Sequence, residues 1–409
     1  MRKKIAVTLL ISCLFLTGCW DNIELNDIAI VTGMGIDPGK EKKYRLTVGY
    51  INPTQFSKQN PSQGAPVSSF SLEGNSLPEI SARMNIGVSR RLVFSHTRAI
   101  YINEDIAKEG VSTFLDSLER SGQFRNDFNI LITQGHDAEK FTMINDPLEK
   151  VPSLKTQKQI KTIVEGWGGD PRVRLTDFIN AIVSKGRSSV ATKVIIKGNP
   201  EKGKNAESNM SVEPEANILL DGMGVFKHDK LLGFLSLEET RNFNWTQQLE
   251  HTMVSIPCRD YDDEDEKEKQ YFDLVVTNNK PNLKTYYQGD TPQLKVDIHA
   301  EGRINSMQCP EDMTKLTIYE DMEEKSAKYI ENVIMETIKK VQEDFGVDIF
   351  GFGEALHRQH YQKSKEVEDN WDEEFKRADV EVTAKVAIRR SGIRNRGFNT
   401  NLPKEAQGE

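Results

Sequence analysis

The stretch YEDMEEKSAKYIENVIMETIKKVQEDF, residues 319–345, is the longest helical pattern in the chain. Its apolar and small side chains recur every three or four residues, a spacing that places them along one face of a helix. This face consists of Met322, Ser326, Tyr329, Val333, Ile334, Ile338, Val341 and Phe345. Gly346 follows where a left-handed residue commonly ends a helix. The pattern favours a helix that covers a sheet, and a face that recruits a partner helix is the alternative.

The sequence before and after this helix predicts the strands of the sheet that it covers. Residues 379–390 alternate between apolar and polar side chains, and 293–304 and 272–277 do so as well. Alternation with a period of two is typical of strands with one buried face. We therefore expect a C-terminal domain over residues 216–392, an antiparallel sheet with the long helix on one face, followed by a polar tail at 393–409.

Strands and helices alternate in the first half of the chain. Residues 28–36 and 44–51 read as a hairpin around Asp37-Pro38-Gly39, and 104–121 and 175–184 have helical spacing. We expect an α/β region over 19–197, with two subdomains and a mixed sheet. Residues 198–215 carry almost nothing apolar and predict a linker. The predicted fold class is a multi-domain α+β protein with mixed and antiparallel sheets packed by helices.

The first residues predict export and lipid attachment. Arg2, Lys3 and Lys4 precede the apolar run Ile5 to Leu16, which is shorter than the roughly 17 to 25 residues of a membrane-spanning helix. The ending Leu16-Thr17-Gly18-Cys19 resembles a bacterial lipobox. We expect cleavage between Gly18 and Cys19, removal of residues 1–18, and a diacylglyceryl group and N-acyl chain on Cys19. An ordinary signal peptide with an incidental cysteine is the alternative.

The charge of the chain limits its partners. The formal net charge is -8, and loss of the three basic signal residues makes it -8 - 3 = -11. So acidic a protein is repelled by anionic lipid and by nucleic acid, which leaves the acyl chains on Cys19 as the expected attachment to the membrane. Nucleic acid is not an expected partner. The segment 260–269 is acidic and predicts a solvated loop, since it lacks the ligand spacing of a calcium loop.

Few residues suggest chemistry. After Cys13 and Cys19 are set aside, Cys258 and Cys309 can form a disulfide in an exported protein or remain as free thiols. His357 and His360 lie near Glu354 on an expected helix, but they lack a third strong ligand, so we expect no metal. Trp167, Trp245 and Trp371 could line a small-molecule pocket, although large aromatic residues more often lie in the core. Motifs for nucleophilic catalysis or phosphate binding are missing, and we expect neither an enzyme nor a bound cofactor.

Several stretches together resemble one family. They begin with Cys19-Trp20-Asp21 and IELNDIAIVTGMGID, and continue through SRRLVFSHTRAIYINEDIAKEG (89–110) and DGMGVFKHDKLLGFLSLEETRNFNW (221–245). FGVDIFGFGEALHRQHY (345–361), Trp371 and VEVTAKVAIRRSG (380–392) complete the series. The chain is similar in these segments to the Ger(x)C family, the lipoprotein C subunits of nutrient germinant receptors in endospore-forming bacteria.

The resemblance implies a three-domain mixed α/β protein, lipid-anchored on the outer face of the spore inner membrane. It implies assembly with an A-type and a B-type polytopic membrane subunit and a role in germination with nutrients. Only Cys19 carries over as a residue with a definite role. The alternatives are a solute-binding lipoprotein that delivers a nutrient to a permease, and a surface hydrolase.

Overall fold

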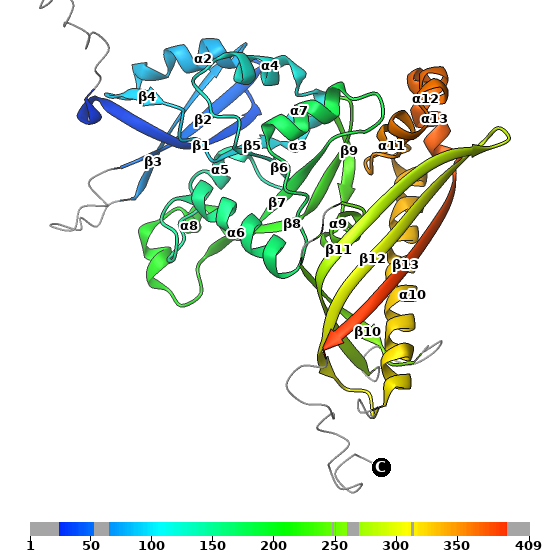
Figure 1. Cartoon of the computed structure of the whole chain (residues 1–409). Helices are drawn as coiled ribbons and strands as arrows, with labels where there is room; N and C mark the ends of the chain where they lie inside the picture. Colours follow the sequence, from blue (N-terminus) through cyan, green and yellow to red (C-terminus); the bar gives the residue numbers. More distant parts are fainter. Residues whose placement is uncertain are drawn as a thin grey trace, which may run out of the picture.

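The computed structural model describes residues 24–52, 65–259 except 248 and 250, 270–311 and 315–390. Two sheets packed by helices make up this part of the chain (Figure 1). This confirms the predicted class, a multi-domain α+β protein with mixed and antiparallel sheets. The signal segment with Cys19, the acidic stretch 260–269 and the polar tail 393–409 lie outside the described residues.

The larger sheet has nine strands and contains every strand of the first 235 residues that the structure describes. Its order is β3-β2-β1-β5-β6-β7-β8-β9, with β4 beside the start of β1. The core strands β1, β5, β6 and β7 are parallel, and antiparallel pairs flank them on both sides. The strands are β1 (Ile28–Pro38), β2 (Tyr44–Ile51), β3 (Val67–Gly74), β4 (Arg91–Val93), β5 (Ala99–Asn103), β6 (Asn129–Thr133), β7 (Val190–Gly198), β8 (Ala216–Lys227) and β9 (Lys230–Leu235).

Helices cover both faces of this sheet because successive side chains of its central strands are buried on opposite sides. Ile100 and Ile102 pack under the helices of one face, and Tyr101 packs under those of the other. The first face carries α2 (Leu77–Arg83), η3 (Met84–Ile86), α3 (Glu104–Glu109), α4 (Ser112–Arg120) and α7 (Leu175–Val183), and the second carries α5 (Ala138–Phe141), α6 (Pro152–Gly166) and α8 (Pro200–Gly203).

Residues 198–215 do not separate two sheets. The strand before them, β7, and the strand after them, β8, are antiparallel neighbours from Val190↔Val225 to Gly198↔Ala216. The polar segment folds into α8 and η4 (Ala206–Met210) and connects the two strands. This corrects its interpretation as a linker, which rested on its composition alone.

The smaller sheet consists of β10 (Thr252–Pro257), β11 (Tyr271–Gln288), β12 (Thr291–Met307) and β13 (Asp379–Arg390). β10, β11 and β12 are antiparallel, but β13 is parallel to β12. The expectation of an antiparallel sheet is therefore wrong for its last strand. The long helix α10 (Leu316–Asp344) connects β12 to β13 as a crossover, and such a connection joins parallel strands.

Helix α10 covers one face of this sheet, as its periodicity predicts (Figure 1). Ile330 is buried where the prediction had Tyr329 and Val333, which are half-buried. Gly346 ends the helix with a φ of 61°, and its N–H donates to the Val341 carbonyl at 2.8 Å. The helix also protects the free edge of β13, since Glu331 accepts from the Ala384 N–H at 2.8 Å and Glu323 from the Ile388 N–H at 2.7 Å.

The two sheets share one hydrophobic core. Val190 and Val225 of the larger sheet belong to the same buried cluster as Val296 and Ile338 of the smaller sheet and α10. Helix α9 (Leu237–Asn244) connects the sheets in sequence, and α11 (Phe352–Gln359), α12 (Tyr361–Val367), η5 (Glu368–Asn370) and α13 (Trp371–Lys376) lie between α10 and β13. Among the described helices, none has the length and apolar character needed to cross a bilayer.

Candidate functional site: the junction between the sheets

Two segments distant in sequence meet at the junction. The loop after α7, residues 184–188, lies against the start of α11. The Ser188 N–H donates to the Asp348 carbonyl at 2.6 Å, and the Glu354 N–H donates to the Gly186 carbonyl at 3.2 Å. Gly186 and Gly353 are in backbone contact, because a Cβ on Gly353 would lie 2.6 Å from the Cα of Gly186. The junction therefore requires a glycine on each side.

Asp348 holds the α11 side of the junction together. Its Oδ1 accepts from the N–H groups of Phe350 and Gly351, each at 2.9 Å. Its Oδ2 accepts from the Gly353 N–H at 2.8 Å and from Trp371 Nε1 at 3.0 Å. Burial raises the pKa of Asp348 to about 6, although these four donors act in the opposite direction. The carboxylate thus links the turn before α11 to the start of α13.

Ion pairs surround this contact. Lys185 contacts Glu368 at 3.1 Å and Asp369 at 2.9 Å, and Lys227 of β8 contacts Asp372 of α13 at 2.8 Å. Two cavities lie at the junction, with volumes of about 420 and 460 Å³. Both are lined by Lys185 and Trp371 and by acidic residues of 354–373. Exposed pairs of this kind contribute about 0 to 1 kcal/mol each, so the shared core and Asp348 dominate the stability of the junction.

Glu354 and His357, which were weighed as metal ligands without a metal being expected, lie at this junction. Glu354 accepts from Ser184 Oγ at 3.1 Å and lies 3.6 Å from Arg187 Nε. His357 contacts Ser364 Oγ at 3.3 Å and the ring of Tyr361. Within the described ranges, no three histidine, cysteine, aspartate or glutamate side chains are arranged to hold a metal ion.

The three tryptophans do not line a common pocket. Trp371 lines the junction cavities, Trp245 is fully buried in the shared core, and Trp167 stacks under the guanidinium of Arg241 at 4.5 Å. Sequence reasoning had noted Trp371 but missed Asp348, which binds it. The Asp-x-Phe-Gly-x-Gly run at 348–353 is the signal that could have revealed this turn, since glycines and an acceptor side chain recur there.

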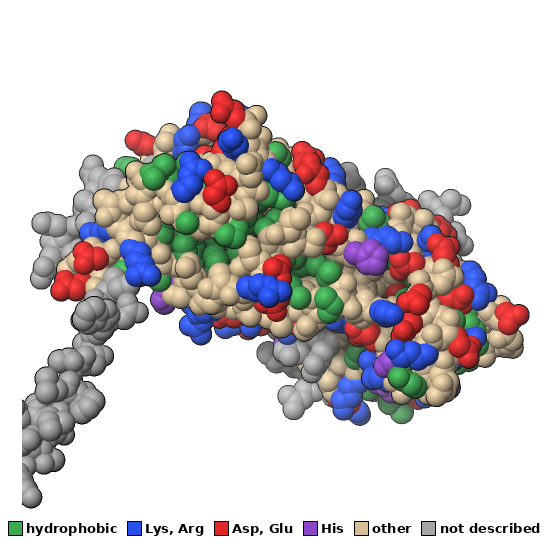
Figure 2. Space-filling view, turned by 90° about the horizontal axis from the view of Figure 1, so that it is seen from above, with side chains coloured by type: hydrophobic (Ala, Val, Ile, Leu, Met, Phe, Trp, Pro, Cys, Tyr) green, Lys and Arg blue, Asp and Glu red, His purple; other side chains and the backbone are tan. Residues whose placement is uncertain are grey.

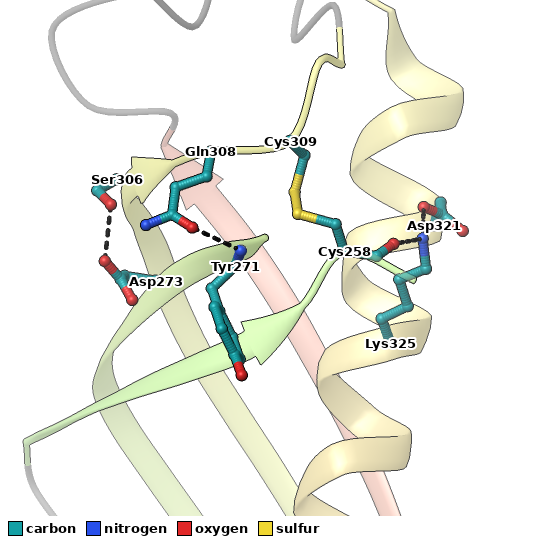
Figure 3. Close-up of a disulfide and its surroundings, with 8 residues drawn as sticks. All are labelled: Cys258, Tyr271, Asp273, Ser306, Gln308, Cys309, Asp321 and Lys325. Atoms are coloured by element: carbon teal, nitrogen blue, oxygen red, sulfur yellow. Dashed lines mark hydrogen bonds and ion pairs between the residues drawn. A yellow bond between two sulfur atoms is a disulfide. The ribbon is translucent and has the colours of Figure 1, made fainter. Parts of the chain in front are cut away.

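Cys258 and Cys309 form a disulfide with Cα atoms 5.7 Å apart (Figure 3). Cys258 follows β10 and Cys309 follows β12, so the bond joins the ends of strands on either side of β11. Lys325 of α10 donates to the Cys258 carbonyl at 2.8 Å and pairs with Asp321 at 2.7 Å. The disulfide thus joins the ends of β10 and β12, and Lys325 ties this end of the sheet to the helix that covers it.

The fold and the junction define a multi-domain α+β protein in which two unlike sheets are fixed to each other by one core. Two family models match it, "Spore germination protein N-terminal domain" over residues 21–196 and "Spore germination B3/ GerAC like, C-terminal" over residues 221–392. The chain therefore belongs to this spore germination family, the Ger(x)C family of germinant receptor C subunits.

Individual relatives support this assignment. The chain is 30% identical to spore germination protein KC of Bacillus subtilis (strain 168), with 96% of each chain covered. It is 23% identical to spore germination protein B3 of the same organism, with 90% of this chain and 92% of the relative covered. The crystal structure of the GerBC protein superposes with a TM-score of 0.54 at 17% identity, over 87% of this chain and 97% of that one. The structural likeness shows that the fold is shared.

Proposed function

We propose that this germinant receptor subunit is anchored by lipid on Cys19 and acts without catalysis. The observation that carries the proposal is the sequence Leu16-Thr17-Gly18-Cys19 after a short apolar run with a basic start. Two acyl chains tether a protein stably, whereas one gives only marginal binding. The anchor would hold the two sheets on the outer face of the spore inner membrane.

The partners we propose are the A-type and B-type polytopic membrane subunits of the same receptor. A lipid-anchored body is confined to the membrane surface, where its effective concentration toward membrane partners is high. The fixed junction supports a role in docking, because a rigid surface loses less conformational entropy on binding than a flexible one.

The absence of catalysis is part of the proposal. Three aspartates of the described chain are almost fully buried, Asp37, Asp170 and Asp348, and all three accept from backbone and side-chain donors of the fold. Glu354 and His357 at the junction also contact neighbouring side chains. These groups are used to hold elements together, which is the usual structural reason for a buried, fully bonded polar group.

A solute-binding lipoprotein is the competing function. Such a protein normally has two similar lobes around a cleft, whereas this chain has a nine-stranded mixed sheet and a four-stranded sheet. Titration calorimetry of the protein with individual amino acids and sugars separates the two functions. Heat of binding at micromolar concentration would favour the solute-binding function.

The test of the anchor is Cys19→Ala in spores that contain the same amount of the protein. We expect the variant to leave the inner-membrane fraction and nutrient germination to be lost, because the diacylglyceryl group has no other thiol in the lipobox. Cys13→Ala is the matched control, since Cys13 leaves with the signal segment. Unchanged germination of the Cys19→Ala spores with every nutrient would contradict the proposal.

A further inference from the structure

An apolar groove opens on the helix-covered face of the nine-stranded sheet. It lies between α2, α4 and β4 and has a volume of about 260 Å³. Buried side chains form its floor, and small or uncharged residues form much of its rim. The floor includes Leu77, Leu92, Phe94 and Leu118, and the rim includes Ala82, Asn85, Ser121 and Gln123. Figure 2, which views the molecule from above, shows hydrophobic side chains among mostly uncharged atoms on this face.

The groove lies beside the point where the chain leaves for the lipid anchor. Arg91, which lines the groove, pairs with Ile28 at the start of β1. Ile28 follows Cys19 by nine residues, and nine residues span at most about 32 Å when fully extended. A bilayer that holds the lipid on Cys19 is therefore within reach of the start of β1 and of the groove next to it.

Arg91 is the one charged residue among those that line the groove. It is exposed and forms no ion pair with any residue that the structure describes. On the flanking helices, Glu79 binds Arg83 and Asp116 binds Arg120 at 2.8 and 2.7 Å, and Glu119 forms no ion pair with Arg91. The site thus combines an apolar floor with one unpaired cation at its rim.

We propose that this groove takes part of one acyl chain of an anionic phospholipid from the bilayer, with the phosphate on Arg91. The inference rests on the proposed lipid anchor, which brings the groove to the membrane. The volume suits a segment of one chain, because complete drug-sized ligands need about 300 to 1,000 Å³. The diacylglyceryl group on Cys19 is uncharged and would leave Arg91 without a partner, so a membrane phospholipid fits better.

This contact also gives the molecule an orientation. After removal of the three basic signal residues the net charge is -8 - 3 = -11, and a protein of this charge is repelled as a whole by an anionic surface. A single cation beside an apolar groove turns one side of the body toward the lipid. The β4 and α2 side of the larger sheet then faces the bilayer, close to the anchor.

The test uses the acylated full chain in phosphatidylcholine vesicles that contain phosphatidylglycerol with a photoreactive group in one acyl chain. Peptide mass spectrometry locates the adducts after illumination. We expect them at residues 81–85 and 121–124. Replacing the photoreactive lipid by its phosphatidylcholine analogue should reduce groove labelling about fivefold, the factor that corresponds to about 1 kcal/mol for one arginine at an anionic surface.

Three variants make the result specific. Ala82→Trp fills the rim and should abolish groove labelling, and Arg91→Glu should remove the preference for phosphatidylglycerol. Lys161→Glu, an equal charge change on α6 on the opposite face, should label as the parent does. Labelling outside the groove only, or an unchanged preference in Arg91→Glu, would overturn the inference. A chain that fails to float with the vesicles would instead contradict the anchor, so the two failures are distinct.

Discussion

At the residue scale, two buried carboxylates hold elements in place. Asp348 fixes the turn before α11, and Asp170 accepts from Thr192 Oγ1 and the Arg172 N–H, both at 2.7 Å. Burial raises the pKa of each from 3.8 to about 6. A carboxyl group with a raised pKa binds its proton more tightly in the folded state. Its stabilising contribution is therefore complete below pH 3.8 and is lost as the pH rises through 6.

The variant Asp348→Asn isolates the contribution that ionisation of Asp348 makes to the pH dependence of stability. The amide cannot ionise, but its NH₂ group faces the Gly353 N–H and Trp371 Nε1, two donors that Oδ2 accepts from. We expect the variant to be less stable than the parent, with the difference in unfolding free energy shrinking by about 3 kcal/mol from pH 4 to pH 7, since a shift of two pKa units corresponds to that amount. Urea unfolding followed by circular dichroism at each pH measures it. A difference that does not change with pH would contradict the assignment.

Asp348 also shows what sequence reasoning misses at this scale. Its partners include Trp371, 23 residues later, and a long-range side-chain contact leaves no periodic signal. Gly346, in contrast, could be predicted, because a helix end and its left-handed glycine are set by neighbours in sequence.

At the scale of elements, helices and strands with a regular hydrophobic pattern could be predicted from the sequence. Features that depend on contacts between elements could not. The periodicity of α10 and the alternation of β13 are intrinsic to those stretches, so both elements were found. The helix expected at 104–121 is interrupted at Gly110, whose φ of 126° breaks it into α3 and α4. Strand β3 was not predicted, because an edge strand with half-buried residues shows little alternation. The direction of β13 follows from the crossover through α10, because a connection that contains a helix of this length typically joins parallel strands.

The edge of β13 gives a prediction for this scale. Glu323→Ala with Glu331→Ala removes the acceptors of two edge N–H groups, and an exposed edge is a template for pairing with another chain. We expect a loss of about 1 to 3 kcal/mol per group and concentration-dependent self-association in analytical ultracentrifugation. Glu336→Ala, an exposed position on the same helix, should remain monomeric and as stable as the parent. Monomeric behaviour of the double variant would show that the edge is protected in another way.

The disulfide belongs to the same scale. Cys258 and Cys309 are 51 residues apart, and closing a loop of that length reduces the entropy of the unfolded chain by an amount worth about 4 kcal/mol. Replacing both cysteines by serine should lower the unfolding free energy of the oxidised protein by about that amount. Reductant should bring the parent to the same value as the variant. A parent that does not respond to reductant while it binds a thiol reagent would show that the thiols are free.

At the scale of the whole molecule, the shared core and the junction fix the two sheets in one arrangement. Val190 and Val225 belong to the same cluster as side chains of the smaller sheet, while Ser188 and Gly186 bond to the backbone of 348–354. Composition suggested a boundary at the polar segment 198–215, which instead connects two neighbouring strands of the larger sheet. Composition marks polar stretches, and only the fold shows which distant segments meet.

Gly353→Ala tests whether this fixed arrangement matters. The added Cβ would lie 2.6 Å from both the Gly186 Cα and Trp371 Nε1, and backbone atoms held by a core cannot yield without shifting the sheets. We expect a larger radius of gyration in small-angle scattering, faster proteolysis within 184–188 and weaker nutrient germination. Gly166→Ala is the matched control, since a Cβ there meets no other atom within 4 Å.

Gly186→Ala strains the same contact as Gly353→Ala. The double variant should therefore lose less unfolding free energy than the sum of the losses in the two single variants. Additive losses would show that each glycine acts separately, and the junction would then not be the single contact that sets the orientation of the two sheets.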